Sequence, residues 1–414
     1  MYTDLNLRLT DEQEELKDTL HRFAKEVLRP AGEALDKAGP EAVLSPHSPF
    51  WRARKKMREM GLHLTFIPER FGGTGMGPME HHIVWEELGW GSVGLAISQD
   101  VDVYPAAWLL RMAPNNQRLI EEVIKPYVDD AEGRMIGCWG LTEPQHGSDM
   151  LMAGTPQFKD PSVTQSLRAR KEGHTWILNG QKSAWISNGP VATHALLFVG
   201  IDAAKGMSGG GICVAPLDLP GVSKGPVLKK LGQLDLPQGE VFFDEVRIPE
   251  EYMVVTPERY EFWVEQVLAV ANCGMASLFT GVARSAFELA LDYAKERIQG
   301  GRPIAGHQLV QKKLFDMFLK VETARAYSRA VVEYCFTTIP APLAYAVSAK
   351  AYATQAAFEV AHDALQTFGG YGLTKEYPIE KIFRDARASM LEDGSSEVLA
   401  LIGAANILRS YFTM

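Results

Sequence analysis

Cysteine is scarce in this sequence. The four cysteines, Cys138, Cys213, Cys273 and Cys335, lie far apart along 414 residues, with no CxxC pair and no cluster. A disulfide framework needs closely recurring cysteines and a zinc knuckle needs ligand pairs at short spacing, so both classes are excluded. We expect four ordinary buried thiols in a reducing cytosol.

Long runs of residues with one sign of charge, or of apolar residues alone, are also missing. The chain has 42 Lys and Arg against 51 Asp and Glu, a net charge of −9, without a single-sign run, which argues against a nucleic-acid surface. The opening residues MYTDLNLRLTDEQEELKD are acidic and polar where a signal peptide needs a basic start and an apolar run. No stretch reaches about 18 uncharged apolar residues. We predict a cytoplasmic protein without a membrane span, whose partners are small molecules or other proteins.

Standard catalytic motifs are absent as well. The chain has no GxSxG, HExxH or GxxxxGK[ST] motif and no strand-GxGxxG-helix unit. The adjacent His81 and His82 could be metal ligands, but they precede an apolar helical run, which favours partly exposed helix positions. We therefore propose no metal.

What the sequence does contain is the composition of a globular protein of two or three domains, with 46% hydrophobic and 22% charged residues. Helical periodicity dominates residues 1–134, where Thr10 and Gln13 form a predicted capping pair. From 135 to 255, short apolar segments alternate with turn signals, and SLRARKEGHTWILNGQKSAWISNG and GEVFFDEVRIPEE both look like antiparallel hairpins without crossover helices. Residues 256–414 return to helical periodicity with one long apolar helix. The predicted fold class is α+β: an N-terminal helical domain, a central antiparallel β domain and a C-terminal helical bundle.

Two segments carry residues suited to chemistry. The first, CWGLTEPQHGSD at 138–149, places an aromatic ring, backbone amides and hydroxyls at a strand end, where they can line a polar ring edge. The second, QTFGGYGLTKEYPIEKIFRDAR at 366–387 followed by LEDGSSEV at 391–398, combines a diglycine turn, a helix end and an acid-Gly-Ser loop. It indicates close backbone approach to a phosphate-bearing ligand and one carboxylate presented on a tight loop.

Nearly the whole chain resembles the acyl-CoA dehydrogenase family of flavoenzymes. Besides the two segments above, the resemblance is carried by LTDEQEELKDTLHRFAKEVLRP, GLHLTFIPERFGGTGMG, NGQKSAWISNG, VFFDEVRIPEE and YAKERIQGGRPIAGHQLVQKKLFDM. It implies FAD as the cofactor and a CoA thioester as the substrate, oxidised by α-proton abstraction with hydride transfer to flavin N5. It also implies an electron-transferring flavoprotein as the electron acceptor and a homotetramer. The helix, strand, helix order read from periodicity is this family's architecture too.

The resemblance also assigns roles to positions of this sequence. The positions that contact the flavin ring are Trp139, Leu141, Thr142, Ser148, Trp185 and Ser187. The positions that hold the FAD pyrophosphate and adenosine across a subunit boundary are Arg297, Gln308, Gln366, Gly369 and Gly370. Ser395 and Glu397 fall on the loop that meets the neighbouring flavin, and the substrate positions are Ser148, Asp100, Asn272 and Gly394. Taken singly, the tryptophans read as core aromatics and QTFGGYG as a helix cap; the joint pattern favours the cofactor site.

The base position departs from the family pattern. The usual base is the Glu of an acid-Gly-Thr loop, and here that position is Asp393, with Glu392 in the preceding, normally aromatic, place. We predict that Asp393 is the base rather than Glu392. An Asp is one methylene shorter, and a misplacement of about 1 Å can lower the rate on the order of 100-fold, so the substrate or the loop must sit differently.

Four further positions depart from the pattern. Asn272 stands where the family commonly has an Arg near the base loop, and the loss of a cation there should raise the carboxylate pKa. Asp100 falls near the floor of the acyl pocket, as a second catalytic acid or as a satisfied loop carboxylate. His146 replaces a small residue, and Gly300 replaces an aromatic, which affects adenine packing.

These departures leave several functions open. Alicyclic acyl-CoA dehydrogenases resemble this chain in replacing the usual base and in using an Asp at the ring-binding end of the pocket, and a cyclohexane- or cyclohexene-carboxyl-CoA is our leading substrate class. The alternatives are a branched acyl-CoA, an ordinary aliphatic acyl-CoA dehydrogenase with an Asp base, a nitroalkane oxidase-like flavoenzyme and a non-catalytic scaffold of the same fold.

Overall fold

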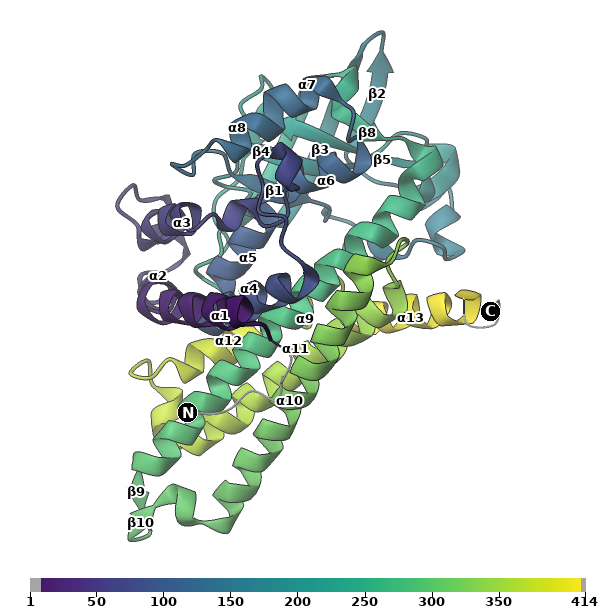
Figure 1. Cartoon of the computed structure of the whole chain (residues 1–414). Coiled ribbons are helices and arrows are strands. Elements are labelled where there is room, and N and C mark those ends of the chain that lie inside the picture. The colour runs from purple at the N-terminus through teal and green to yellow at the C-terminus, as the bar shows by residue number, and fades with distance from the viewer. Residues whose placement is uncertain (1–8, 411–414) are drawn as a thin grey trace.

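Helices build both ends of the chain and strands its middle, as the computed structural model shows (Figure 1). The structure describes residues 9–410, so the opening residues used for the signal-peptide prediction lie partly outside it. The predicted capping pair is confirmed: the Gln13 N–H donates to Thr10 Oγ1 at 3.3 Å and the Thr10 N–H to Gln13 Oε1 at 3.1 Å. The N-terminal helices are α1 (Asp11–Phe23), α2 (Arg29–Ala38), α3 (Pro49–Glu59), α4 (Pro78–Gly91), α5 (Val93–Asp102), α6 (Tyr104–Met112), α7 (Gln117–Leu119) and α8 (Lys125–Val128).

The central strands form one sheet with the order β6-β7-β3-β2-β4-β5-β8, and β1 pairs with β4. Most pairings are antiparallel, including the predicted hairpin of β2 and β3, but β1 and β2 each pair with β4 in parallel, which the sequence patterns did not indicate. The strands are β1 (Gly137–Gly140), β2 (Arg168–Glu172), β3 (Thr175–Ser187), β4 (His194–Gly200), β5 (Gly210–Pro216), β6 (Val222–Lys224), β7 (Gln238–Pro249) and β8 (Met253–Val255).

The segment GEVFFDEVRIP is one continuous strand, β7, so the predicted hairpin there is wrong. The turn-like residues form an irregularity instead: Glu245 has a φ of +51°, and the register against β3 shifts between Leu178 and Gly180. The Asn179 side chain spans this irregularity, because it accepts from the Glu245 N–H at 2.9 Å and donates to the Glu245 carboxylate at 2.5 Å. Side-chain bonds therefore replace the missing ladder bonds of a β-bulge.

The C-terminal part is built on α9, which runs from the sheet to the far end of the molecule beside α10 and α11 (Figure 1). Its most apolar stretch could cross a membrane by length and composition, yet that stretch lies wholly inside the molecule, as in a core helix. The strands of the sheet end at Val255 and α9 begins at Pro257, and we keep 1–134, 135–255 and 256–414 as the proposed domains. The elements are α9 (Pro257–Glu296), β9 (Ile298–Gln299), β10 (Arg302–Pro303), α10 (Gln308–Thr337), α11 (Leu343–Phe368), α12 (Ile379–Ala388) and α13 (Ser396–Ser410).

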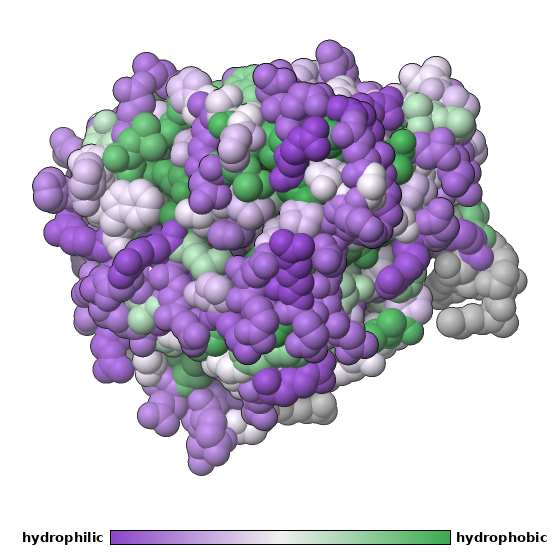
Figure 2. Space-filling view, turned by 90° about the horizontal axis from the view of Figure 1, so that it is seen from above, coloured by the Kyte–Doolittle hydropathy of each residue, from purple (hydrophilic) through white to green (hydrophobic). Residues whose placement is uncertain are grey.

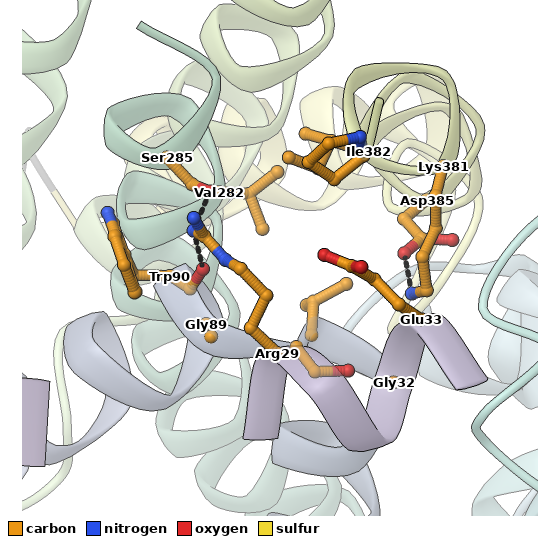
Figure 3. A pocket seen from close by; sticks show the side chains of 14 residues that line it. Arg29, Gly32, Glu33, Gly89, Trp90, Val282, Ser285, Lys381, Ile382 and Asp385 are labelled. Carbon is orange, nitrogen blue, oxygen red and sulfur yellow. Dashed lines mark hydrogen bonds and ion pairs between the residues drawn. The ribbon is translucent and has the colours of Figure 1, made fainter. Parts of the chain in front are cut away.

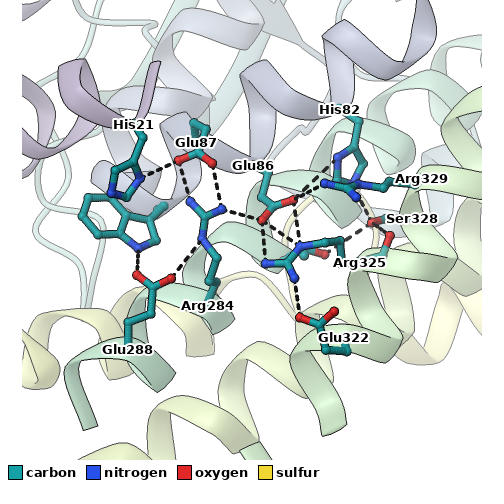
Figure 4. Close-up of polar contacts among 12 residues, drawn as sticks. His21, His82, Glu86, Glu87, Arg284, Glu288, Glu322, Arg325, Ser328 and Arg329 are labelled. Atoms are coloured by element: carbon teal, nitrogen blue, oxygen red, sulfur yellow. Dashed lines mark hydrogen bonds and ion pairs between the residues drawn. The ribbon is translucent and has the colours of Figure 1, made fainter. Parts of the chain in front are cut away.

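A buried network of charges joins α1, α4, α9 and α10 (Figure 4). Arg284 of α9 donates to Glu86 at 2.9 Å and to Glu87 at 2.7 Å, Arg325 of α10 donates to Glu86 at 3.0 Å, and His21 of α1 lies 2.9 Å from Glu87. Burial alone would raise the pKa of Glu86, but Arg325 and Arg284 outweigh it and hold that pKa well below the usual range. Burial is likewise outweighed at Glu87, where Arg284 lowers the pKa. These charges fix the N-terminal helices against the bundle.

The face seen from above is mostly hydrophilic, with hydrophobic side chains in smaller areas (Figure 2). Large apolar side chains are nevertheless exposed along two C-terminal helices. They are Leu309, Phe315 and Leu319 of α10 and Leu401 and Leu408 of α13. These two helices therefore offer apolar surface for contact with another protein.

Candidate active site

A cavity of about 940 Å³ opens where the sheet, α5, α9 and the loop after α12 meet. The sheet contributes Trp139 from β1 and Trp185 from β3, α5 contributes Asp100, and the loop after α12 contributes Asp393. Segments that are almost 300 positions apart in sequence thus line one space. The volume is within the usual range for binding sites of organic ligands.

The predicted flavin-ring residues share this cavity. They are Trp139, Leu141, Thr142, Ser148, Trp185 and Ser187. The Trp139 indole N–H is buried without a hydrogen-bond partner among residues 9–410, and Trp185, which lines the same cavity, is 57% exposed. An unpaired buried donor is costly unless a ligand satisfies it, so an aromatic wall with such a donor fits a planar heterocycle such as a flavin.

A buried ion pair fixes the turn after β1, which also lines the cavity. The Glu143 carboxylate accepts from the Lys182 ammonium at 2.7 Å and from the Leu167 N–H at 3.0 Å, and both side chains are fully buried. Burial would raise the pKa of Glu143, but Lys182 reverses the direction and holds it low. The sequence reasoning missed Lys182, because nothing in the sequence pairs a residue of β3 with the turn after β1.

His146, which departs from the family pattern, lies at the edge of the same cavity. Its Nδ1 lies 2.7 Å from Asp149, which also accepts from the Gly147 N–H at 2.7 Å. The imidazole is therefore fixed to its own turn, and it adds a polar group to the rim.

The loop with the predicted base turns tightly. Asp393 and Gly394 follow one another with φ values of +48° and +96°, and a Cβ at Gly394 would lie 2.7 Å from Leu399. Glycine is required at 394 for both reasons. The turn directs both Asp393 and Glu392 to the cavity, so the structure brings together the two carboxyl groups between which the sequence left a choice.

Both carboxyl groups of this loop have raised pKa values. Burial raises the pKa of Asp393 to about 6, against the lowering effect of Lys350. Burial raises the pKa of Glu392 to about 7, although Gln233 donates to it at 3.0 Å and Lys230 also lowers the pKa. Gln233 and Lys230 reach this loop from the segment between β6 and β7, which the sequence analysis had not singled out. A carboxyl with a pKa near neutrality is suited to proton transfer.

Asp100 lines the same cavity as the base loop. Its Oδ1 accepts from the Trp85 indole at 2.9 Å and its Oδ2 from the Tyr104 hydroxyl at 3.2 Å. Burial raises the pKa of Asp100 to about 7, and the nearby charge of Asp393 contributes. Asp100 and Asp393 therefore interact electrostatically across the cavity that they share.

The remaining residues near the base loop have mainly structural contacts. Ser148 Oγ accepts from the Ser395 N–H at 2.9 Å, which ties the turn after β1 to the base loop. Asn272 does not line the cavity: it lies fully buried behind the loop, and its amide donates to the Asp393 carbonyl at 3.3 Å. The predicted substrate contact of Asn272 is replaced here by a contact to the loop backbone. Glu397 is exposed at the start of α13.

The predicted pyrophosphate and adenosine residues lie far from the cavity, at the end of α9 that carries β9 and β10 (Figure 1). They are exposed, and they comprise Arg297, Gln308, Gln366, Gly369 and Gly370. The Arg297 guanidinium lies 5.6 Å from the Tyr371 ring, so two of the predicted segments do meet. Gly300 occupies a turn with a φ of +64°, which explains why an aromatic is absent there.

Two other features are not part of this site. A second cavity, of about 30 Å³, lies between α2, α4, α9 and α12 beside Arg29, and it has room for about one water molecule (Figure 3). The prediction that His81 and His82 are partly exposed is wrong, because α4 is enclosed and both are buried; His81 stacks on Phe66 with ring centroids 4.3 Å apart. Over residues 9–410 no group of three or more His, Cys, Asp or Glu side chains could hold a metal ion.

Comparison with known proteins gives one answer over the whole chain. Models of the acyl-CoA dehydrogenase N-terminal, middle and C-terminal domains match residues 10–132, 138–246 and 263–408. The chain is 32% identical to the mitochondrial short-chain specific acyl-CoA dehydrogenase of Rattus norvegicus, over 98% of this chain and 92% of that one. It is 30% identical to the benzylmalonyl-CoA dehydrogenase of Aromatoleum aromaticum, over 97% of this chain and 100% of that one.

A solved structure gives the same result. The butyryl-CoA dehydrogenase of Megasphaera elsdenii superposes with a TM-score of 0.85 at 27% identity, covering 98% of this chain and 100% of that one. This similarity extends over all three parts of the fold. The chain therefore belongs to the acyl-CoA dehydrogenase family.

Proposed function

We propose that this FAD-dependent acyl-CoA dehydrogenase oxidises a compact acyl-CoA, with alicyclic CoA thioesters as the leading class and branched acyl groups next. The observation that carries the proposal is that Asp393 and Asp100 face one cavity whose wall holds the flavin-ring positions. Trp85 and Tyr104 lie behind Asp100, and the Tyr104 ring lies 5.6 Å from that of Trp139. We infer that these aromatic side chains restrict the space beside Asp100, which favours a short or cyclic acyl group over a long chain.

Asp393 is the proposed base. The oxidation removes a proton from Cα and a hydride from Cβ of the acyl group, and FAD, when bound, supplies the acceptor for the hydride. With a pKa of about 6, the Asp393 carboxyl is ionised at neutral pH and can take up the proton. The Asp393 backbone N–H is the proposed donor to the thioester carbonyl, because the base and this donor then share one loop.

Asp100 is proposed as a second acid-base group for ring substrates. It lines the same cavity as the base loop and interacts electrostatically with Asp393, so both carboxyl groups can act on one bound acyl group. If Asp100 has this role, Asp100→Asn should impair oxidation of cyclic acyl-CoAs while leaving linear ones. Equal activity on every substrate would contradict the role.

The remaining cofactor residues imply an assembly. Trp139, Leu141, Thr142, Ser148, Trp185 and Ser187 would hold the flavin ring, whereas Arg297, Gln308, Gln366, Gly369 and Gly370 lie outside the cavity at the end of α9. We propose that one subunit's exposed set holds the pyrophosphate and adenosine of a neighbour's FAD, with Ser395 and Glu397 near that boundary, in a homotetramer. The apolar surfaces of α10 and α13 support such contacts. We further propose a cytoplasmic location and an electron-transferring flavoprotein as the acceptor.

The test is an anaerobic titration of the FAD-loaded protein with linear, branched, dicarboxylic and alicyclic acyl-CoAs and a nitroalkane, followed by flavin absorbance. Bleaching by an alicyclic or branched acyl-CoA alone is the expected result. Bleaching by linear chains would make the protein an ordinary aliphatic dehydrogenase with an Asp base. Bleaching only by the nitroalkane would mean that the protein is a nitroalkane oxidase-like flavoenzyme that uses no CoA substrate. The Asp in place of the usual Glu favours this alternative. A protein that takes up no FAD would be a scaffold.

A further inference from the structure

The backbone of the base loop is held by side chains from three separate elements. The Asn272 amide of α9 donates to the Asp393 carbonyl at 3.3 Å, and the Lys350 ammonium of α11 donates to the Gly394 carbonyl at 2.8 Å. Ser148 Oγ accepts from the Ser395 N–H at 2.9 Å. Since Asp393 and Gly394 both have left-handed backbone conformations, this turn depends on outside contacts to keep its shape.

Lys350 is the charged member of this set. Its side chain is fully buried, and among residues 9–410 its ammonium donates to the carbonyl of Gly394, the residue that directly follows the base. Burial lowers the pKa of Lys350 to about 8, and the carboxyl groups of Asp393, Glu392 and Glu397 oppose that lowering. A buried ammonium that faces a carbonyl and three acidic groups is placed to act on those groups.

Lys229, Lys230 and Arg387 line the same cavity, and Lys230 lowers the pKa of the neighbouring Glu392; the other groups near Asp393 bring no positive charge. Asp100 of α5 and Tyr104 of α6 interact with it across the cavity, Glu392 precedes it in the loop, and Asn272 of α9 is neutral. In the part of the chain that the structure describes, Lys350 is the cation that acts on the Asp393 carboxyl. The α9 position that lacks an arginine is thus matched by a lysine from α11.

We propose that Lys350 is the positioning residue of the base: its ammonium fixes the turn that aims Asp393 and supplies the positive charge that keeps the carboxylate ionised when an acyl group fills the cavity. The proposal rests on the proposed function in one respect, that Asp393 is the base. An acyl group displaces water from the cavity and so disfavours a charged carboxylate. Lys350 reaches the loop from behind and is not among the residues that line the cavity, so an acyl group does not displace it.

Removing the charge should shift the pH dependence of flavin reduction. An opposite charge at close range lowers a carboxyl pKa by about 1 to 3 pH units. Lys350→Met should therefore move the acidic limb of the pH–rate profile to higher pH by that amount. The rate at pH 7 should then fall roughly 2- to 100-fold. Once the pH lies well above the shifted pKa of Asp393, which is at most about 9, the carboxyl is ionised in both proteins and the lysine itself has lost its proton, so the two rates should converge.

The experiment is stopped-flow reduction of the FAD-loaded protein by an acyl-CoA that bleaches it, from pH 5.5 to 9.5. Lys350→Arg, which keeps the charge, should retain the wild-type profile. Lys350→Gln, which keeps a donor without a charge, should give the shifted profile, and it replaces the methionine variant if that one does not hold FAD. Thr354→Val is the matched control, because Thr354 is equally buried one turn along α11 and donates to the Lys350 carbonyl rather than to the loop.

The outcomes separate this proposal from the proposed function. An unshifted profile in FAD-bound Lys350→Met or Lys350→Gln, with Asp393→Asn inactive, would overturn the role of Lys350 and leave Asp393 as the base. The same shift in Thr354→Val would also overturn it, since any buried change in α11 would then suffice. If Asp393→Asn reduced FAD at the wild-type rate, the assignment of the base itself would be wrong.

Discussion

Two clusters of buried charge differ in the direction in which their carboxyl pKa values move. In the network between α4, α9 and α10, arginines outweigh burial and hold the pKa values of Glu86 and Glu87 low. Around the base loop, burial dominates: it raises the pKa of Asp393 to about 6 and the pKa values of Glu392 and Asp100 to about 7. Burial acts on both clusters, so the supply of cations decides whether a carboxylate is a fixed structural charge or a group that exchanges protons near neutral pH.

The largest effect that tests this contrast is the loss of the proposed base. Asp393→Asn should retain FAD and lower the rate of flavin reduction by acyl-CoA about 10²- to 10⁴-fold, because an amide cannot take up the proton. Stopped-flow reduction measures the rate, and the flavin spectrum reports cofactor content. Glu392→Gln is the matched neighbour and should keep most of the activity; the reverse ranking would move the base to Glu392.

A substitution in the charge network between α4, α9 and α10 should change the stability of the protein rather than its activity. Arg284→Met leaves Glu86 and Glu87 buried with fewer cations, and the free energy of unfolding should fall by about 3 to 5 kcal/mol. Denaturant unfolding of the FAD-loaded protein measures it. Lys312→Met, which breaks an exposed pair with Asp316, should change stability by about 0.5 kcal/mol or less. Similar small losses in both variants would show that the buried network is not a structural element.

The pH dependence of the wild-type enzyme should show the raised pKa of the base. Below about pH 6 the Asp393 carboxyl is protonated, so kcat/KM should fall about tenfold per pH unit. Steady-state assays with the substrate found in the titration measure how kcat/KM falls at low pH. If kcat/KM began to fall only near pH 4, the Asp393 pKa would not be raised and the contrast between the two clusters would fail.

The smallest effect concerns Asp100 and stability. Its pKa is about 7 in the folded protein, above the ordinary value near 3.8, so the folded state is favoured at low pH and loses that advantage as pH rises through about 7. Asp100→Asn should therefore raise the melting temperature at pH 8, by about 1 to 4 °C, and not at pH 4. Thermal melts at the two pH values measure the difference, with exposed Asp316→Asn as the control. A gain at pH 4 would contradict the sign.

The sequence predicted the parts of the site that depend on local order. The turn after Trp139 and the acid-Gly-Ser loop could be recognised because each is a short segment with its own backbone demand, such as the positive φ at Gly394. The helical first and last parts and the β2–β3 hairpin were predicted for the same reason. The hairpin in GEVFFDEVRIP was not correct, because the bulge at Glu245 is closed by Asn179, a residue of another strand.

The sequence could not identify the residues that tune the site. Lys350 and Gln233 belong to segments with no chemical signature of their own, and Lys182 lies in NGQKSAWISNG without a role that the motif itself assigns. Each acquires its role only by reaching a loop far away in sequence. The exposure of His81 and His82 was misjudged for the same reason, since only the packing of α4 decides it.

By itself, the sequence determined the order of helices and strands, the family of the chain and the position of its acidic loop, because periodicity and short motifs are properties of neighbouring residues. The tertiary structure decided which carboxyl groups share the cavity and which cations reach them. A pKa depends on burial and on charges within a few ångströms, and those distances exist only once segments far apart in the chain have packed together.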